Sequence, residues 1–321
     1  MKAARANEFG GPDVIRVVDL PTPSPGPGQV LVRVEAAGVN FIDVYMRSGL
    51  YKGSLPVLLG KEGAGTVEAV GAGVSDVQPG DRVAWASVNG SYATHLIAPA
   101  SALVKVPDAI DSRRAAAAML QGMTAHYLAK STFELGPGHT CVVHAAAGGV
   151  GLLLCQLAAS AGAHVIGTVS TKEKAALARG AGARDVIIYT EEDFEQAVRA
   201  IAPDGVDVVY DAVGKTTFDK SLACLRTRGL LVSYGQSSGP VPPIDVLKLK
   251  HGAKYLTRPS LEHYTETREE LVARAGELLS LIGSGALNIR IHDALSLERA
   301  ADAHRMLESR ETTGKVLLLP G

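Results

Sequence analysis

The stretch "HAAAGGVG", residues 144–151, lies between the short β-branched run "TCVV" and the apolar run "LLLCQLAASAGA", which has helical spacing. Glycines between a strand and a helix allow a phosphate to approach the backbone closely. The spacing fits a Rossmann βα turn, in which Gly148 would face a pyrophosphate and Gly151 would let the helix pack on the strand. The first glycine of G-x-G-x-x-G is replaced by Ala146, which predicts a slightly different turn geometry. A glycine cluster that serves packing alone is the alternative.

Strand and helix patterns alternate on both sides of this turn and predict an α/β fold. Strands spaced by helices form βαβ units with a parallel sheet that is covered on both faces. The expected strands are 140–146, 164–170, 185–189, 206–213 and 229–235, with helices at 171–183 and 191–202. The first 120 or so residues are β-rich, with strand-like runs at 30–39 and 64–70. The last part holds helix candidates at 267–285 and 296–309 and a strand at 314–319.

Composition narrows the class of protein. The chain has 321 residues, of which 46% are hydrophobic and 20% charged, as expected for a soluble globular protein of about two domains. No window has the roughly 18 apolar residues of a membrane span, and the N-terminus lacks a secretory signal. The net charge of −1 gives no reason to expect a nucleic acid or membrane partner. The three cysteines are far apart and predict no disulfide framework, so we expect a reducing cytoplasm.

The end of the strand at 164–170 predicts which cofactor binds. NAD-binding Rossmann folds place an acidic residue there, which hydrogen-bonds the adenosine ribose. This strand ends in Ser170, and Lys172 and Lys174 follow. A serine with lysines would accept a 2′-phosphate through charge-assisted hydrogen bonds, so NADPH is predicted rather than NADH. The alternative is that these lysines only keep a helix start soluble.

Six segments together resemble the zinc-independent quinone oxidoreductases, the zeta-crystallin-like branch of the medium-chain dehydrogenase/reductase superfamily. They are "GVNFIDVYMRSGLY" (38–51), "GKEGAGTVEAVGAGV" (60–74), "GDRVAW" (80–85), "HAAAGGVG" (144–151), "YGQSSG" (234–239) and "TRPSL" (257–261). The resemblance implies a GroES-like catalytic domain made of residues 1–123 and completed by 259–321. It implies a Rossmann NADP-binding domain at 124–258, with the cofactor in the cleft between the two domains.

The departures from the zinc-dependent branch predict that no metal is bound. Zinc members carry Cys where this chain has Asn40 and His where it has Lys61, and they have a four-cysteine lobe near residues 85–115. A catalytic zinc needs about three protein ligands and an open position. Without this Lewis acid, alcohol oxidation is disfavoured and reduction of an electron-poor acceptor remains.

The resemblance places catalytic candidates in "VNFIDVY" and "SGLY", at the nicotinamide end of the cleft. Tyr51 would donate a hydrogen bond or a proton to a carbonyl oxygen, and Tyr45 lies in the same segment. For both tyrosines, core packing is the alternative. Asn40 interrupts an apolar run and needs a partner when buried, either the cofactor or a backbone group. Asp43 and Asp211 are interpreted as structural acids.

The expected cofactor-binding residues lie at strand ends and helix starts. Gly149 and Val150 open the helix after the glycine turn, and the strand at 185–189 ends in Tyr189. The resemblance places Thr124, Tyr127, Tyr189 and Arg310 beside the cofactor. The loop after the strand at 229–235 would hold the nicotinamide riboside through Gly235, Gln236 and Ser238, and Arg258 would lie near the same end. For Thr124 and Tyr127, the alternative is that they are ordinary helix residues. For Arg258 the alternative is an interdomain salt bridge, and for Tyr189 and Arg310 it is packing at the surface.

The function that follows is hydride transfer from NADPH to a quinone or a related electron-poor α,β-unsaturated carbonyl. A 2-enoyl-thioester reductase is one alternative, and it would need a basic patch for a carrier phosphate that the N-terminal half lacks. A crystallin-like or RNA-binding role is another, against which the near-neutral charge argues. The resemblance implies a homodimer, and residues 235–249 are expected to lead into an edge strand that pairs across the dimer.

Overall fold

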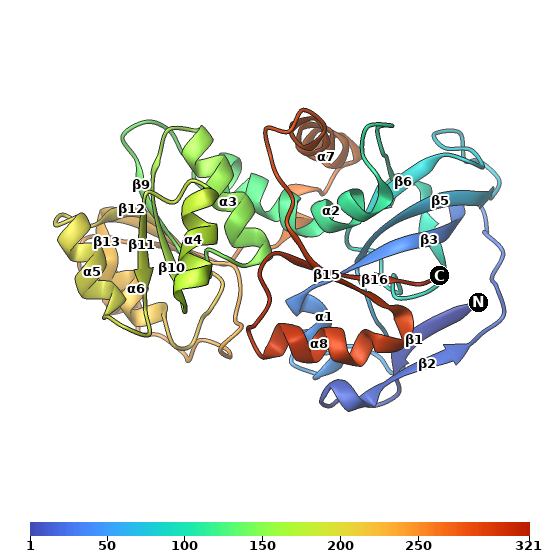
Figure 1. Cartoon of the computed structure of the whole chain (residues 1–321), viewed down its shortest axis with the longest axis horizontal. Coiled ribbons are helices and arrows are strands. Elements are labelled where there is room, and N and C mark those ends of the chain that lie inside the picture. The colour runs from blue at the N-terminus through green and yellow to red at the C-terminus, as the bar shows by residue number, and fades with distance from the viewer. The chain divides into compact units, whose positions relative to one another are not determined.

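The computed structural model describes residues 1–321, which form two compact units. Unit 1 comprises Met1–Met123 and Thr265–Gly321, and unit 2 comprises Thr124–Tyr264. The chain therefore leaves unit 2 after residue 264, somewhat later than the expected boundary at 258. Both chain termini belong to unit 1 (Figure 1).

Unit 2 is built on a six-stranded sheet in which all neighbours are parallel. Its strands are β9 (Thr140–Val143), β10 (His164–Val169), β11 (Asp185–Ile188), β12 (Val206–Asp211), β13 (Leu225–Ser233) and β14 (Tyr255–Thr257). The spatial order is β11-β10-β9-β12-β13-β14, the order of dinucleotide-binding Rossmann sheets. The direction of winding reverses between β9 and β12, and ligands of such sheets bind outside the carboxyl ends of the strands at this switch point.

Helices cover both faces of this sheet. Figure 1 shows α3 (Gly149–Ser160) and α4 (Lys172–Gly180) on one side, and α5 (Phe194–Ile201) and α6 (Phe218–Cys224) on the other. The strands are consequently apolar on both faces, and Val142, Ile166 and Val209 are fully buried. Three short turns complete the unit: a π-helical turn at Leu128–Thr132, and 3-10 turns at Val246–Lys250 and Leu261–Tyr264.

Capping residues set where two of these helices begin. The Thr171 hydroxyl accepts from Lys174 N and starts α4, and Asp193 accepts from two backbone N–H groups and starts α5. The helices expected at 171–183 and 191–202 are confirmed, although both are shorter. Residues 235–249, which were expected to lead into an edge strand, form a proline-containing loop and a 3-10 turn. The edge strand is β14, which follows it.

Unit 1 contains a seven-stranded sheet and a three-stranded sheet. The larger has the order β15-β16-β3-β5-β6-β8, with β7 also paired to β3, and the smaller has the order β2-β1-β4. The strands are β1 (Lys2–Ala6), β2 (Ile15–Asp19), β3 (Gln29–Val39), β4 (Val57–Leu58), β5 (Glu62–Val70), β6 (Arg82–Trp85), β7 (His95–Pro99), β8 (Val104–Lys105), β15 (Ile291–Ser296) and β16 (Lys315–Leu319). Val316 of β16 pairs with Val39 of β3, so the C-terminal strand completes the N-terminal sheet.

The helices of unit 1 lie around this sheet. They are α1 (Phe41–Arg47), α7 (Arg268–Gly283), α8 (Ala300–Glu308), and α2 (Ser112–Tyr127), which continues into unit 2, with 3-10 turns at Pro12–Val14, Ala100–Ala102 and Leu297–Arg299. Strand residues such as Val32, Val34 and Val83 form the core together with Trp85. The predicted fold class, a β-rich GroES-like domain with a Rossmann domain, is confirmed. None of the helices has both the length and the apolarity that crossing a membrane requires.

Candidate functional site

The glycine turn after β9 is held tightly against the start of α3. Ala145 adopts a left-handed conformation with φ of 52°, and its carbonyl accepts from Gly148 N at 2.8 Å. A Cβ placed on Gly151 would lie only 2.2 Å from Ala145 O, so only glycine fits there. Ala146 is buried and donates its N–H to Thr168 O of β10. The tight turn is therefore made by Ala145, not by the residue at the first glycine position.

The N-terminus of α3 offers the donors that a pyrophosphate needs. Gly148 is its N-cap residue, and no side chain caps the helix. The first-turn N–H groups at Gly149, Val150 and Gly151 and the positive end of the helix dipole are thus left for an anion. These features fit the phosphates of a dinucleotide at the carboxyl edge of the sheet.

Ser170, Lys174 and Tyr189 lie where the strands β10 and β11 end. Thr190 Oγ1 donates to Ser170 O at 2.8 Å, and Tyr189 N donates to Val169 O at 3.0 Å, so the ends of β10 and β11 adjoin. Tyr189 is 44% exposed, and Lys174 lies in the first turn of α4. The sequence interpretation overlooked Glu173 beside them. Its carboxylate is held by its own backbone N–H and by Thr171, which lower its pKa.

The loop after β13 is attached to the loop after β12. Gly235 N donates to Asp211 O, and a Cβ on Gly235 would lie 2.5 Å from Ala212 O. Ser238 Oγ donates to Val213 O at 2.7 Å and accepts from Thr216 N at 3.1 Å. Residues 234–239, including Gln236, therefore lie at the carboxyl edge, next to the switch point.

The other cofactor candidates are more scattered. Thr124 and Tyr127 lie on α2 and are 8% and 2% exposed, and the Tyr127 ring stacks on Tyr264 at 4.2 Å. Arg258 follows β14 and is exposed. Arg310 belongs to unit 1, in an exposed turn after α8 with φ of 62°. Their contacts with a cofactor stay predictions.

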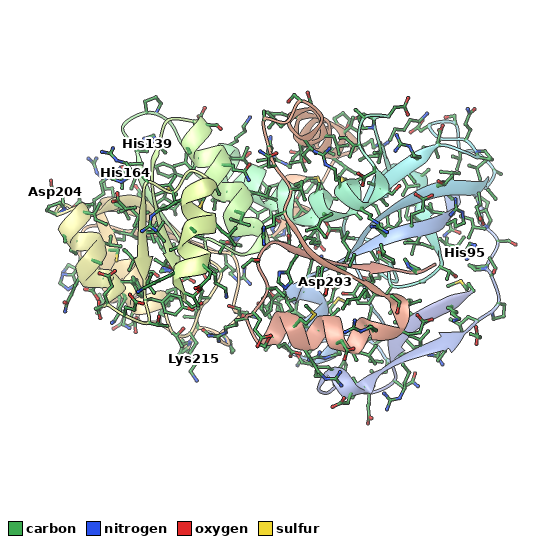
Figure 2. The ribbon with its side chains drawn as sticks, viewed as in Figure 1. His95, His139, His164, Asp204, Lys215 and Asp293 are labelled. Carbon is green, nitrogen blue, oxygen red and sulfur yellow. The ribbon has the colours of Figure 1, made fainter.

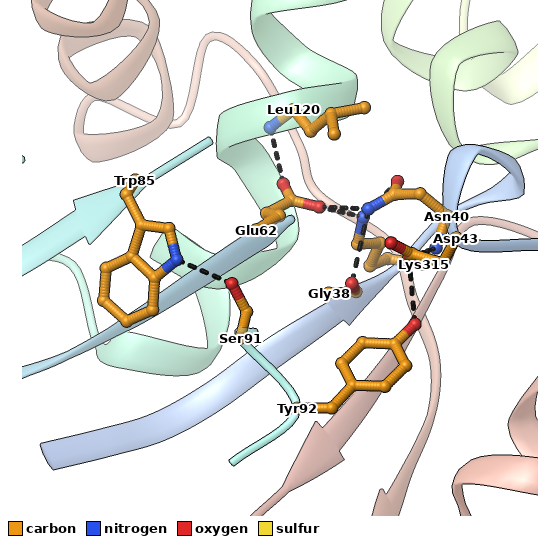
Figure 3. A network of polar contacts seen from close by, with 9 residues as sticks. All are labelled: Gly38, Asn40, Asp43, Glu62, Trp85, Ser91, Tyr92, Leu120 and Lys315. Atoms are coloured by element: carbon orange, nitrogen blue, oxygen red, sulfur yellow. Dashed lines mark hydrogen bonds and ion pairs between the residues drawn. The ribbon is translucent and has the colours of Figure 1, made fainter. Parts of the chain in front are cut away.

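Asn40 is buried at the start of α1, and its amide is fixed by three partners (Figure 3). Nδ2 donates to Glu62 Oε2 at 2.8 Å and to Gly38 O at 3.3 Å, while Oδ1 accepts from Lys315 Nζ at 2.8 Å. Both amide hydrogens are used, so Asn40 has only an acceptor lone pair left for a ligand. Asn40 is thus unable to donate to an oxyanion, and an acceptor role toward a hydroxyl group remains open to it.

Lys315 and Glu62 form a buried ion pair in which the ammonium is 1% exposed and the carboxylate is fully buried. Glu62 Oε1 also accepts from Leu120 N of α2 at 2.6 Å. Burial lowers the pKa of Lys315, and the Glu62 charge opposes that shift. The pair links β5, β16 and α2 to the residue that starts α1.

Asp43 of α1 extends the polar network of Asn40, Glu62 and Lys315 to Tyr92. Its Oδ2 accepts from Asn40 N and from the Tyr92 hydroxyl, both at 2.9 Å, while Oδ1 has no hydrogen-bond partner. Burial raises the pKa of Asp43 to about 7. Behind Tyr92, His304 contacts Arg47, which pairs with Glu308 at 2.8 Å. Burial, with the Arg47 charge, lowers the pKa of His304 to about 3.

The side chains of Tyr45 and Tyr51 are in contact. Their ring centroids are 5.3 Å apart, and Tyr51 N donates to Tyr45 O at 3.0 Å. Tyr45 is 8% exposed and Tyr51 is 37% exposed. The Tyr45 side chain is therefore buried, whereas that of Tyr51 is partly open to solvent.

Two histidines of unit 2 lie away from the carboxyl edge of its sheet. Figure 2 shows His139 and His164, at the amino ends of β9 and β10, opposite Lys215, which follows β12. No three His, Cys, Asp or Glu side chains in the structure converge to hold a metal ion. Where zinc-dependent relatives would have a metal ligand, the Asn40 side chain contacts the Lys315 ammonium instead.

The sequence interpretation missed Lys315 and Glu62. The sequence signal for them was a charged residue at the start of an apolar strand, Lys315 in "GKVLLL" and Glu62 in "GKEGAG". A charge that is buried with such a strand requires a partner.

Comparisons with known proteins agree with this architecture. Residues 26–108 match the alcohol dehydrogenase GroES-like domain family, and residues 149–275 match the zinc-binding dehydrogenase family. The chain is 48% identical over 317 residues to a quinone oxidoreductase of Pseudomonas aeruginosa, covering 97% of each. It is 42% identical to a 2-haloacrylate reductase of a Burkholderia species, covering 99% of this chain and 98% of the relative.

A solved structure resembles the chain over its full length. The Escherichia coli quinone oxidoreductase, crystallised with NADPH, superposes with a TM-score of 0.98 at 43% identity, covering 100% of both chains. Fold, motifs and relatives therefore agree, and the chain belongs to the quinone oxidoreductase branch of the medium-chain dehydrogenase/reductase superfamily.

Proposed function

We propose that this chain is an NADPH-dependent quinone reductase that works without a metal. It transfers a hydride to a quinone or a similar electron-poor α,β-unsaturated carbonyl, and a proton from the medium completes the reduction. The observation that carries this proposal is the glycine turn before α3, a helix without a side-chain cap, at the switch point of the sheet. The chain also resembles, over its full length, an enzyme that was crystallised with NADPH.

The residues of unit 2 bind and orient the cofactor. When bound, NADPH supplies the hydride. The first turn of α3 holds its pyrophosphate, and Ser170, Lys174 and Tyr189 hold its 2′-phosphate. Residues 234–239 hold the nicotinamide riboside. The remaining proposed contacts are Thr124, Tyr127 and Arg258 of unit 2 and Arg310 of unit 1.

The residues of unit 1 act on the acceptor. The partly exposed Tyr51 hydroxyl donates a hydrogen bond to the acceptor oxygen that gains charge, and the Tyr45 ring supports it. The side-chain oxygen of Asn40, which Lys315 orients, accepts a hydrogen bond from a hydroxyl group of the cofactor. The kinship to a 2-haloacrylate reductase favours activated alkenes as a second class of acceptor.

We also propose a homodimer in a reducing cytoplasm. β14 is an edge strand whose Tyr255 is 58% exposed, and Val246 and Leu247 of the preceding 3-10 turn are 74% and 65% exposed. Unpaired strand groups next to apolar side chains favour pairing with a second copy. Sedimentation of the wild type and of Leu247→Asp tests this, since the variant should be monomeric. Cys141, Cys155 and Cys224 are free thiols, which suits a reducing compartment.

Steady-state rates test the proposed activity. NADPH oxidation is measured with ortho- and para-quinones, enones and enoyl thioesters as acceptors, at fixed salt. We expect the largest kcat/KM with a quinone. Turnover of enoyl thioesters alone, or no oxidation of NADPH with any quinone, would contradict the proposal.

A further inference from the structure

A buried series of hydrogen bonds crosses the switch point of unit 2. His144 follows β9, Asp211 ends β12, and Ser221 of α6 lies between them. His144 Nε2 is 3.0 Å from Ser221 Oγ, which donates to Asp211 Oδ2 at 3.1 Å. On its other side, His144 Nδ1 is 2.8 Å from Thr168 Oγ1 of β10. All four residues are at most 1% exposed.

The direction of each hydrogen bond follows from the partners of Asp211. Its carboxyl group accepts from Val213 N, Gly214 N, Thr217 Oγ1 and Ser221 Oγ. Two backbone N–H groups on Oδ1 and the hydroxyl groups of Ser221 and Thr217 on Oδ2 stabilise a negative charge, so we take Asp211 as a carboxylate. Ser221 has one hydroxyl hydrogen, which Asp211 takes, and Ser221 must therefore accept from His144 Nε2–H. His144 Nδ1 then accepts from Thr168.

The histidine is neutral in this arrangement. Burial lowers the pKa of His144, in agreement with a ring that donates at one nitrogen and accepts at the other. The Phe194 ring meets it edge-on at 4.9 Å and holds its plane. The ring is thus fixed in tautomer and in orientation.

Asp211 fixes the loops at the carboxyl edge. Its Oδ1 accepts hydrogen bonds from two consecutive backbone N–H groups, those of Val213 at 2.7 Å and Gly214 at 2.9 Å. The Val213 carbonyl in turn accepts a hydrogen bond from Ser238 Oγ, and Tyr234 N donates to the backbone carbonyl of Asp211. The loop at 212–217 and the loop at 234–239 therefore depend on how the Asp211 carboxylate is oriented.

We propose that His144 is a positioning residue for hydride transfer. Through Ser221 it orients Asp211, and Asp211 sets the two loops that hold the nicotinamide half of the cofactor. The adenosine half lies at the ends of β10 and β11, outside the reach of these loops. This inference rests on the proposed use of NADPH.

The test separates the two halves of the cofactor. NADPH and adenosine 2′,5′-bisphosphate are titrated into the wild type, His144→Leu and Ser221→Ala, and the hydride-transfer rate is measured in a single turnover with a quinone. Both variants should bind NADPH about tenfold more weakly, the effect of one lost buried hydrogen bond, and should bind the bisphosphate as the wild type does. Hydride transfer should slow by a similar factor.

Two further variants distinguish positioning from general loss of stability. His144→Gln keeps a donor toward Ser221 and should restore much of the NADPH affinity. Val142→Ala creates a cavity in the same strand without touching the series, and should lower the thermal midpoint without changing the ratio of the two affinities.

The outcomes are distinct. The positioning role would be overturned if His144→Leu and Ser221→Ala weakened the binding of NADPH and of the bisphosphate equally. It would also be overturned if Val142→Ala changed the ratio of these two affinities in the same way. Failure of the wild type to bind either ligand would instead overturn the proposed cofactor, and this inference with it.

Discussion

Replacing Lys315 with Met tests the buried ion pair of unit 1 directly. Methionine has a similar length but no charge, so Lys315→Met leaves the Glu62 carboxylate fully buried without a countercharge. Removing one partner of a buried pair typically costs about 3–5 kcal/mol. Since whole domains are stable by only about 5–15 kcal/mol, we expect a large fall in the free energy of unfolding.

Glu62→Gln should cost less than Lys315→Met. The Lys315 ammonium then still faces Asp43, whose charge raises the pKa of the lysine. In the double variant neither charge remains, so its loss of stability should be smaller than the sum of the two single losses by about 2 kcal/mol or more.

Urea unfolding of the wild type, both single variants and the double variant measures these energies as a cycle. Additive losses would refute the reasoning, as would a single Lys315→Met variant that unfolds at the same urea concentration as the wild type.

Three further predictions concern titration, catalysis and metal. The pKa of Asp43 is raised by burial to about 7, so the folded state binds more protons than the unfolded state between about pH 4 and 7, and this contribution to stability falls as pH rises. Asp43→Asn should therefore gain in stability relative to the wild type between pH 5 and pH 8 in urea unfolding, and a constant difference would contradict it. Tyr51→Phe should lower kcat/KM for quinone by about 1–3 kcal/mol without changing NADPH binding, and equal rates would leave Tyr51 as packing. A chelator should leave activity unchanged, whereas stoichiometric zinc whose removal abolishes activity would exclude the metal-free account.

The fold of unit 2 was predictable because its signals are local. Strands such as 164–170 are apolar on both faces, and Gly148 and Gly151 mark the turn before α3 by their spacing. Helix ends were less predictable, since Asp193 caps α5 after the point where the helical pattern begins. The GroES-like architecture came from the family resemblance, because short β-rich runs do not specify which strands pair.

The polar network of unit 1 could not be predicted from spacing. Glu62 and Lys315 are separated by most of the chain, and their contact exists only once β16 has joined the sheet beside β3. The same folding decides the role of Asn40, whose amide hydrogens are taken by Glu62 and Gly38. Asp43 and Asp211 were interpreted as structural acids, and both are buried, but the groups that each one orients are visible only in the hydrogen bonds of the structure.

The most direct test of the account is the titration of NADPH and NADH into the wild type, Lys174→Ala and Ser170→Asp at fixed salt. A charge-assisted hydrogen bond from lysine to a phosphate contributes about 1.5–3 kcal/mol, so Lys174→Ala should weaken NADPH binding by about ten- to a hundredfold and leave NADH nearly unchanged. Ser170→Asp should weaken NADPH further, because it repels the 2′-phosphate, and should favour NADH. A wild type that prefers NADH, or a Lys174→Ala variant that loses both cofactors alike, would contradict the account.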